Sequence, residues 1–333
     1  MYPECTAYDF ERFREETARI LRKNEARLVL DLPSEKQMQE GILYFDLNRW
    51  KGRGRFSDEN KARKGVLDFL SDVRNLFSGC FSLATMACKE VGESEKYRLF
   101  FLNPESKPVT VLRSHLTKEE SEARTEIELP DVSGWIREYR NLLSTSACIP
   151  ADSFPVSIGL VVLNEEKATV GKYSEEVYAL LKEKYTVEIL HAARNYREEE
   201  NRWLETGIPL IVEIGRIAAK KNQVILVGRE QREPVPLESM MHEIERIDRL
   251  RRESFLDASF RRNAAWSENK TEFASLRPGN RFCCCLNLDC LNRIRTEKGF
   301  EIIAQPFSNR LFSEVCVVCK GKAKTCLFGM AKK

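Results

Sequence analysis

The 333-residue sequence has no run of apolar residues close to the roughly 18 that a membrane-spanning helix needs, so no membrane partner is expected. Its opening residues, MYPECTAYDFERFREE, are acidic and aromatic. A secretory signal would begin with basic and then apolar residues, and a mitochondrial presequence would be poor in acids. These absences predict an intracellular protein, cytoplasmic by default, with a mitochondrial location still open.

The sequence also has few histidines and only a small net charge. The three histidines, His115, His191 and His242, lie far apart, and no serine or cysteine beside them has the pattern of an activated nucleophile. A hydrolase-type catalytic triad is therefore not predicted. A formal net charge of +3 neither requires nor excludes a nucleic-acid partner, so the local distribution of charge has to decide.

The hydrophobic pattern predicts an α/β chain of several domains, because 333 residues exceed the length of one ordinary domain. Residues 1–150 combine helix-like segments with strand-like runs such as KYRLFFLNP and ARTEIELP, and are predicted to form a mixed α/β region of unknown type. Within it, KGRGRF (residues 51–56) is interpreted as a glycine-broken basic loop without the strand-then-helix context of a phosphate cradle.

Residues 151–262 alternate more regularly between strand and helix. The apolar runs VSIGLVVLN, TVEILHA, PLIVEIG and NQVILVGRE alternate with helices of about ten residues, which predicts a βαβ-type domain on a parallel or mixed sheet buried on both faces. Ser174 is the predicted N-cap of one helix, and Gly207 is predicted to end the next. Residues 263–333 are predicted to form a small α+β domain that carries most of the cysteines.

Seven of the eleven cysteines lie in the last 51 residues, within NRFCCCLNLDCLNRIR and EVCVVCKGKAKTC. An odd total and this clustering fit a disulfide framework poorly, whereas clustered thiols in a reducing compartment are typical of a metal site. Cys316 and Cys319 form a C-x-x-C pair, which one tight turn can aim at a single ion. The upstream pair must contain Cys290 and one of three consecutive cysteines, namely Cys283, Cys284 and Cys285.

Four protein ligands would leave no position for water, so a Zn²⁺ ion here would be structural and would perform no chemistry. Buried reduced thiols and redox-active thiols are the alternatives. The scattered cysteines are interpreted as ordinary buried or surface thiols; they are Cys5, Cys80, Cys88 and Cys148.

Two groups of motifs resemble a known family. TGIPLIVEIG followed by KNQVILVGRE resembles the anticodon-binding domain of class II aminoacyl-tRNA synthetases, and more narrowly prolyl-tRNA synthetase of the eukaryotic and archaeal type. The C-x4-C and C-x-x-C pairs, Pro306-Phe307 between them and Leu327-Phe328-Gly329 after them follow the order of that family's C-terminal zinc-binding domain. The resemblance covers about residues 150–333. It implies a zinc site formed by Cys285, Cys290, Cys316 and Cys319.

Departures from the family pattern concern catalysis. Gly215-Arg216-Ile217-Ala218 stands where the family carries G-P-R-D, and REEENRW replaces its S-P-G-W-K-F loop. In the family, an arginine-and-acid motif and a later glycine-rich strand with an arginine grip ATP, and no such catalytic core is recognised in residues 1–150. Aminoacylation by this chain alone is therefore not expected, and any activity would be related to that of aminoacyl-tRNA ligases.

The resemblance also implies a surface that reads RNA. Unpaired bases are recognised by hydrogen bonds to their edges, by stacking, and by basic contacts to phosphate. The acidic run of residues 198–200 would repel phosphates on this face, so a solvated helix with a buried tryptophan is the alternative interpretation. The candidate RNA-binding residues are Arg194, Arg202, Trp203 and Arg229.

Three basic runs could serve RNA independently: residues 49–64, residues 246–252 and residues 320–333. Taken together, the patterns predict a non-catalytic, prolyl-tRNA-synthetase-like RNA-binding protein that takes part in, or helps assemble, a larger ribonucleoprotein. Its RNA would be tRNA or ribosomal RNA. One alternative is a scaffold that has lost RNA binding and dimerises or docks a protein partner. Another is an appendage subunit of a divergent prolyl-tRNA synthetase.

Overall fold

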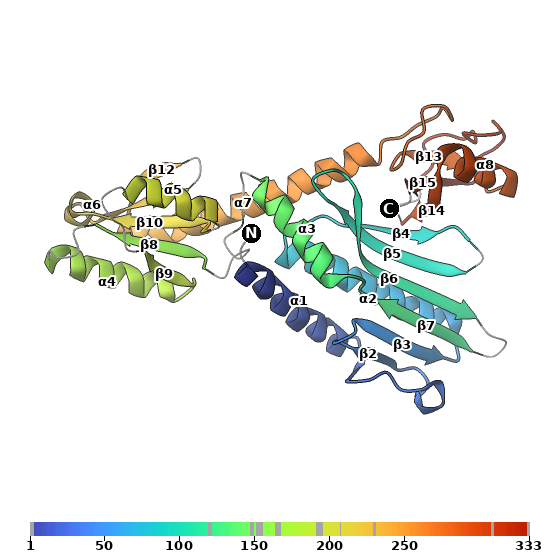
Figure 1. The fold of residues 1–333 in the computed structure, drawn as a ribbon, viewed down its shortest axis with the longest axis horizontal. Coiled ribbons are helices and arrows are strands. Elements are labelled where there is room, and N and C mark those ends of the chain that lie inside the picture. The colour runs from blue at the N-terminus through green and yellow to red at the C-terminus, as the bar shows by residue number, and fades with distance from the viewer. Residues whose placement is uncertain are drawn as a thin grey trace. The chain divides into compact units, whose positions relative to one another are not determined.

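The computed structural model describes residues 3–92, 94–118, 122–146, 150, 156–163, 168–190, 196–206, 208–228, 231–307 and 310–331 (Figure 1). Close contacts divide the chain into two compact units. The first unit contains Met1–Glu11 and Arg140–Leu256, and the second unit contains Arg12–Tyr139 and Asp257–Lys333. Both mix helices with strands, as predicted. These two units are defined by contacts and do not test the predicted sequence domains. The three domains with boundaries at residues 150 and 262 therefore stay a prediction.

A ten-stranded sheet forms the second unit, in the order β1-β2-β3-β7-β6-β5-β4-β14-β15-β13. Its neighbours are antiparallel except for β1 and β2, which are parallel. Strands from the two ends of the sequence meet where Ala304 of β14 lies opposite Glu90 of β4 (Figure 1). The strands are β1 (Arg27–Val29), β2 (Leu43–Asp46), β3 (Lys51–Phe56), β4 (Met86–Glu90), β5 (Glu95–Leu102), β6 (Pro108–Lys118), β7 (Ala123–Glu128), β13 (Arg281–Cys284), β14 (Phe300–Pro306) and β15 (Thr325–Ala331).

Helices pack against this sheet around an aromatic core. Helix α2 packs against β3, β6 and β7, and the indole of Trp135 meets the rings of Phe13 and Phe81 edge-on at 4.7 Å and 5.6 Å. Such edge-to-face pairs add to the stability that burial of the rings provides. The helices with residues in this unit are α1 (Pro3–Lys23), the short 3-10 helix η1 (Glu35–Gln37), α2 (Glu59–Cys80), α3 (Val132–Ser144), α7 (Leu237–Trp266) and α8 (Leu288–Lys298).

The prediction that KGRGRF is a loop is wrong: these residues form β3, and α2 follows with Asp58 as its N-cap. The two glycines alternate with outward-facing charged residues because aromatic rings fill the inner face. A Cβ atom on Gly52 would lie 2.5 Å from the Phe45 ring, and one on Gly54 would lie 2.7 Å from the Phe56 ring. The glycines therefore admit ring packing in a strand, and do not break the chain into a loop.

The first unit contains a mixed five-stranded sheet in the order β12-β11-β10-β8-β9. Strands β9, β8 and β10 are parallel, and β11 and β12 are antiparallel additions, which confirms the predicted mixed sheet. Every residue of β10 is buried, as expected for a strand covered on both faces. The strands are β8 (Ile158–Val162), β9 (Val187–Leu190), β10 (Leu210–Ile214), β11 (Gln223–Val227) and β12 (Arg232–Pro236).

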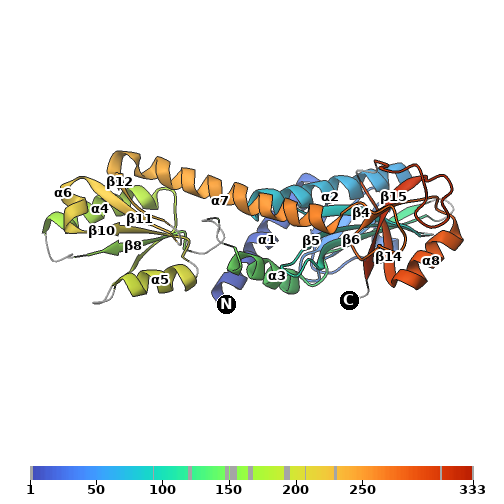
Figure 2. The same ribbon diagram turned by 90° about the horizontal axis from the view of Figure 1, so that it is seen from above.

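Helices lie on both faces of this sheet. Figure 2 shows α5 on one side and α4 on the other. Alternating residues of the strands serve the two cores: Val212 packs with α4 and α7, whereas Ile211 packs with Leu204 of α5. The helices confined to this unit are α4 (Ala168–Lys182), α5 (Tyr196–Thr206) and α6 (Arg216–Lys220).

The predicted N-cap Ser174 is wrong, because α4 begins earlier, at Ala168. Ser174 lies inside the helix, is buried, and donates its hydroxyl hydrogen to the carbonyl oxygen of Gly171 at 2.7 Å. Val170 and Val177 lie on the buried face of the helix. Their burial stabilises the first turns, although several residues before Ser174 have low helix propensity. Gly207, the predicted helix end, lies outside the described residues. None of the described helices has the length and apolar character needed to cross a bilayer.

Candidate functional site

Four cysteines from distant parts of the C-terminal sequence converge in the second unit. The Sγ atoms of Cys285, Cys290, Cys316 and Cys319 all lie within 4.8 Å of one another. The Sγ atom of Cys285 is 3.6 Å from that of Cys290 and 3.7 Å from that of Cys319. These distances are far longer than the roughly 2 Å of a disulfide bond. The cluster could hold one metal ion.

Local structure explains why the spacings work. Cys285 follows the end of β13, and Leu286 has a φ of 65°, which turns the chain sharply into the N-cap of α8 at Asn287. The turn brings Cys290, in the first part of α8, back beside Cys285. Cys283 and Cys284 remain in β13 as buried strand residues and are not part of the four-cysteine cluster.

The second pair lies on a tight hairpin that is tied to β13. The amide of Cys316 donates to the carbonyl of Gly321 at 2.7 Å, and the amide of Lys320 donates to the carbonyl of Cys316 at 3.1 Å. The amide of Val317 donates to the carbonyl of Cys283 at 2.9 Å, which anchors the turn to the sheet. The fold therefore holds the ligand pairs in place through backbone hydrogen bonds.

One thiol of the cluster is prepared for metal binding by the backbone. Burial opposes charge on Cys316, but the backbone N–H groups of Cys319, Cys285 and Val318 donate to its sulfur and lower its pKa to about 6. Burial raises the pKa of the Cys290 thiol, and hydrogen bonds with neighbouring thiols add to the rise. Burial also raises the pKa of Cys284, outside the cluster, to about 12, as expected for a structural thiol.

The structure describes only part of the predicted RNA-binding set. Arg194 and Arg229 fall outside the described residues, and Arg202 is placed in α5 without a described side chain. Trp203 is half-buried and packs against the apolar cluster between α5 and the sheet. An RNA-binding role for these four residues stays a prediction.

The acidic run on α5 does not present three carboxylates to solvent. Glu200 is only 1% exposed and accepts a hydrogen bond from Arg232 of β12 at 2.8 Å. The same guanidinium also binds Glu213, a buried residue of β10. Glu200 therefore faces the sheet and would not repel a phosphate, in contrast to the prediction. Burial, reinforced by hydrogen bonding with Glu213, raises the pKa of Glu200 to about 7.

This triad of two buried carboxylates, Glu200 and Glu213, and the partly exposed Arg232 was not predicted from the sequence. Glu213 is the one residue that could have indicated it. A charged residue in the otherwise apolar, buried strand LIVEI needs a partner for its charge. The position of the partner could not be inferred without the pairing of β10, β11 and β12.

In the first basic run, acidic residues bind the arginines. Arg53 and Arg55 of β3 lie 3.3 Å and 3.6 Å from carboxylate oxygens of Glu126 and Glu122. In the run of residues 246–252, Arg252 contacts Asp248 at 2.7 Å and Arg246 contacts Glu243. These partners reduce the positive charge that both runs can offer to RNA.

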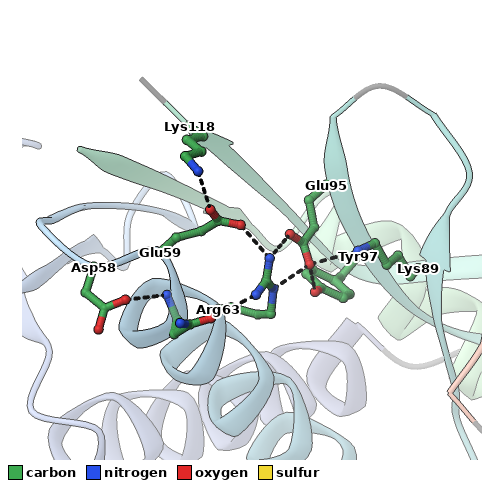
Figure 3. Close-up of polar contacts among 8 residues, drawn as sticks. Asp58, Glu59, Arg63, Lys89, Glu95, Tyr97 and Lys118 are labelled. Atoms are coloured by element: carbon green, nitrogen blue, oxygen red, sulfur yellow. Dashed lines mark hydrogen bonds and ion pairs between the residues drawn. The ribbon is translucent and has the colours of Figure 1, made fainter. Parts of the chain in front are cut away.

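Arg63 belongs to an ion network at the start of α2 (Figure 3). Its guanidinium donates two hydrogen bonds of 2.9 Å to Glu95 of β5 and one to Glu59. The Lys89 ammonium and the Tyr97 hydroxyl donate to the same Glu95 carboxylate. The bond from Arg63, supported by Tyr97 and Lys89, lowers the pKa of Glu95 to about 2. This network joins α2 to the sheet.

Replacing Glu95 with Gln should destabilise the second unit by about 1 to 3 kcal/mol at neutral pH, because charge-assisted bonds to a poorly exposed carboxylate are lost. Since the folded pKa lies below that of the unfolded chain, this contribution is present above about pH 4.5 and is lost as the pH falls toward 2. Urea unfolding across this pH range measures both effects. Glu59→Gln, which affects a more exposed partner of Arg63, should cost less than about 1 kcal/mol. Equal costs for the two variants would contradict the assignment.

Comparison with known proteins identifies one part of the chain directly. Residues 157–247 match the family model of the anticodon binding domain. Proline–tRNA ligase 2 of Clostridioides difficile (strain 630) is 28% identical over 195 residues, which make up 55% of this chain and 40% of that protein. Proline–tRNA ligase of Clostridium botulinum (strain Loch Maree / Type A3) is 30% identical over 131 residues, or 37% of this chain and 27% of that protein. The match thus spans less than half the length of these curated relatives.

A solved structure shows the same fold over a larger part of the chain. Prolyl-tRNA synthetase from Cryptosporidium parvum, complexed with L-proline and AMP, superposes with a TM-score of 0.71 and 17% identity over 85% of this chain and 67% of that chain. This likeness of fold extends into residues 1–150, where the sequence pattern showed no resemblance, and it confirms the mixed α/β multidomain fold. Residues 157–247 of this chain form an anticodon-binding domain of the prolyl-tRNA synthetase type.

Proposed function

We propose that this chain is a prolyl-tRNA-synthetase-like RNA-binding protein that does not itself catalyse aminoacylation. The observation that carries the proposal is the anticodon-binding domain at residues 157–247, where the structure forms a five-stranded sheet. Domains of this type read unpaired bases through stacking and hydrogen bonds to base edges. The RNA would be tRNA, or a ribosomal RNA if the chain acts in a larger ribonucleoprotein.

The charges on the open face of the large sheet support the non-catalytic part of the proposal. ATP recognition there would need arginines available to phosphate oxygens. Arg53 and Arg55 already contact glutamates, and Arg98 makes a 2.7 Å ion pair with Glu90. The Arg98–Glu90 pair lines a hollow of about 290 Å³, which Lys96, Arg113, Glu126 and Glu128 also line. The three glutamates reduce the positive charge that the basic residues of this hollow can offer to a triphosphate.

One observation favours the alternative of a synthetase subunit. Strand β3 is rich in glycine, carries Arg53 and Arg55, and leads into α2, so a glycine-rich strand with arginines does occur in the sheet. If ATP displaced the glutamates, this strand could contact it. Catalysis would then require residues that the chain lacks, supplied by a second protein. A scaffold role without RNA remains a third function for the same fold.

The test measures tRNA binding and proline-dependent ATP–pyrophosphate exchange on the same purified full chain. The proposal expects binding of a proline tRNA transcript, weakening steeply with salt, and exchange no faster than without protein. Trp203→Ala should weaken binding if bases stack on the α5 side, by about 1 to 3 kcal/mol per stacked base. Measurable exchange would overturn the non-catalytic part, and absence of RNA binding would favour the scaffold.

The four-cysteine cluster supports a structural Zn²⁺ site as part of the same proposal. Four thiolates at Zn–S distances of about 2.3 Å in a tetrahedron lie about 3.8 Å apart. The sulfur separations of 3.6 Å and 3.7 Å around Cys285 suit that arrangement. Four sulfur ligands favour zinc over hard cations such as magnesium or calcium. An intracellular, reducing location belongs to this proposal because the thiols must stay reduced to bind metal.

A further inference from the structure

The hairpin that carries Cys316 and Cys319 also carries three exposed lysines, Lys320, Lys322 and Lys324. Unlike the arginines of the other basic runs, these lysines form no ion pair with any residue that the structure describes. The acid nearest in sequence is Glu314, on the opposite arm of the hairpin, where its carbonyl accepts from the amide of Ala323 at 2.8 Å. The hairpin therefore presents uncompensated positive charge.

The backbone fixes Lys322 and Lys324 on one side of the hairpin. Val315 and Lys322 form an antiparallel bridge, and the amide of Lys324 donates to the carbonyl of Cys284 at 2.9 Å. Ala323 and Thr325 are buried, so Lys322 and Lys324 alternate with inward-facing residues and point outward together. Side chains two residues apart in extended backbone repeat at about 6.6 Å, a spacing suited to successive phosphates of one RNA strand.

Apolar residues lie on the same cysteine-bearing segments. Leu286 and Leu288, between Cys285 and Cys290, are 40% and 71% exposed, and Val315, beside Cys316, is 45% exposed. Exposed apolar side chains and unpaired cations on one small structure suit a nucleic-acid strand, whose phosphates take the cations and whose unpaired bases take the apolar contacts. An acidic peptide would use the same chemistry, but RNA is favoured because the chain also contains an anticodon-binding domain.

We propose that Lys320, Lys322 and Lys324 form a second RNA-contacting surface, the lysine face, which binds phosphates of the RNA that the anticodon-binding domain recognises. This inference rests on the proposed function. A simpler role for the lysines would be to offset the negative charge of a zinc ion bound by four thiolates. Among the described contacts, however, no lysine nitrogen is hydrogen-bonded to a cluster sulfur, and the three side chains are exposed.

The experiment measures binding of a fluorescent proline tRNA transcript to the zinc-loaded full chain between about 50 and 200 mM KCl. Lys322→Gln with Lys324→Gln should weaken binding about tenfold or more and reduce the slope of log affinity against log salt by about 1.4 to 1.8. The control pair, Lys107→Gln with Lys118→Gln, removes the same charge at exposed lysines that already contact glutamates, and it should leave the slope unchanged. Lys322→Arg with Lys324→Arg should retain both affinity and slope.

The outcomes separate this inference from the proposed function. If the unaltered chain binds tRNA and the glutamine pair binds with the same affinity and slope, the lysine face is overturned while the proposed function stands. If the unaltered chain binds no tRNA, the inference is overturned, and of the proposed function only the ribosomal RNA form stands. If the glutamine pair loses zinc in metal analysis, the lysines serve the metal and the inference is overturned. An equal loss of affinity in the control pair would also overturn it, because the effect would then be one of overall charge.

Discussion

Replacing Cys316 and Cys319 together with serine should abolish metal binding at the proposed zinc site and unfold the structure around it. The apparent free energy of binding at a structural zinc site is about 10 to 16 kcal/mol, and it is also folding free energy because the site does not persist in the unfolded chain. The hairpin that carries the two cysteines is held by hydrogen bonds from the amide of Cys316 to the carbonyl of Gly321 and from the amide of Val317 to the carbonyl of Cys283. These amides should lose protection when the metal leaves. Metal analysis and hydrogen exchange of residues 281–331 measure the two effects.

Cys284→Ser is the matched control for this prediction. Cys284 is buried one position before Cys285, but its sulfur is outside the four-cysteine cluster. That variant should keep one zinc ion per chain, even if a buried hydroxyl lowers stability. Protein purified without chelators that contains no zinc would contradict the metal assignment, as would retention of zinc by the double serine variant.

Replacing Arg232 with Met will destabilise the first unit by about 3 to 5 kcal/mol, because two buried carboxylates lose the cation that they share. The side chains of Glu200 and Glu213 are only 2% and 5% exposed, so water would hydrate them poorly in place of the partly exposed guanidinium. The loss should be measured by hydrogen exchange of the β10 amides, which reports on this sheet alone. A cost below about 1 kcal/mol would show that the triad contributes no more than a surface ion pair.

The same triad predicts how stability depends on pH. The pKa of Glu200 is about 7 in the folded state and lies above that of the unfolded chain. The folded state therefore binds the proton more tightly, so this contribution is complete below about pH 4.5 and is lost as the pH rises through 7. Glu200→Gln keeps the shape of the side chain and makes it neutral at every pH, so it should remove this part of the pH dependence. At neutral pH it should destabilise the first unit less than Arg232→Met does. An unchanged pH profile in that variant would contradict the assignment.

The cysteine cluster could be predicted from the sequence because the two cysteines of each pair lie close together in the sequence. Each pair of ligands lies within one turn or one helix start, so spacing alone indicates which thiols can converge. Choosing Cys285 over Cys283 and Cys284 required the family resemblance, and the structure supplies the physical reason. The first two are paired strand residues of β13, whereas Cys285 lies beyond its end.

The large sheet could not be predicted, because its strands pair with strands that are distant in the sequence. The pairing of β14 with β4 joins residues more than 200 positions apart, and each strand reads as an ordinary apolar run. The glycines of β3 suggested a loop. They occur in a strand because the rings of Phe45 and Phe56 fill the space that larger side chains would occupy. The Glu200–Arg232 contact was hidden for the same reason, because the order of β10, β11 and β12 brings it about.

Crosslinking of the protein to RNA in living cells, followed by sequencing of the bound RNA, tests the central claim most directly. The account predicts enrichment of one defined RNA, a proline tRNA or a particular region of ribosomal RNA, with crosslinks in residues 157–247. Recovery of no RNA above background would contradict it, and the anticodon-binding fold of this chain would then serve contacts with proteins.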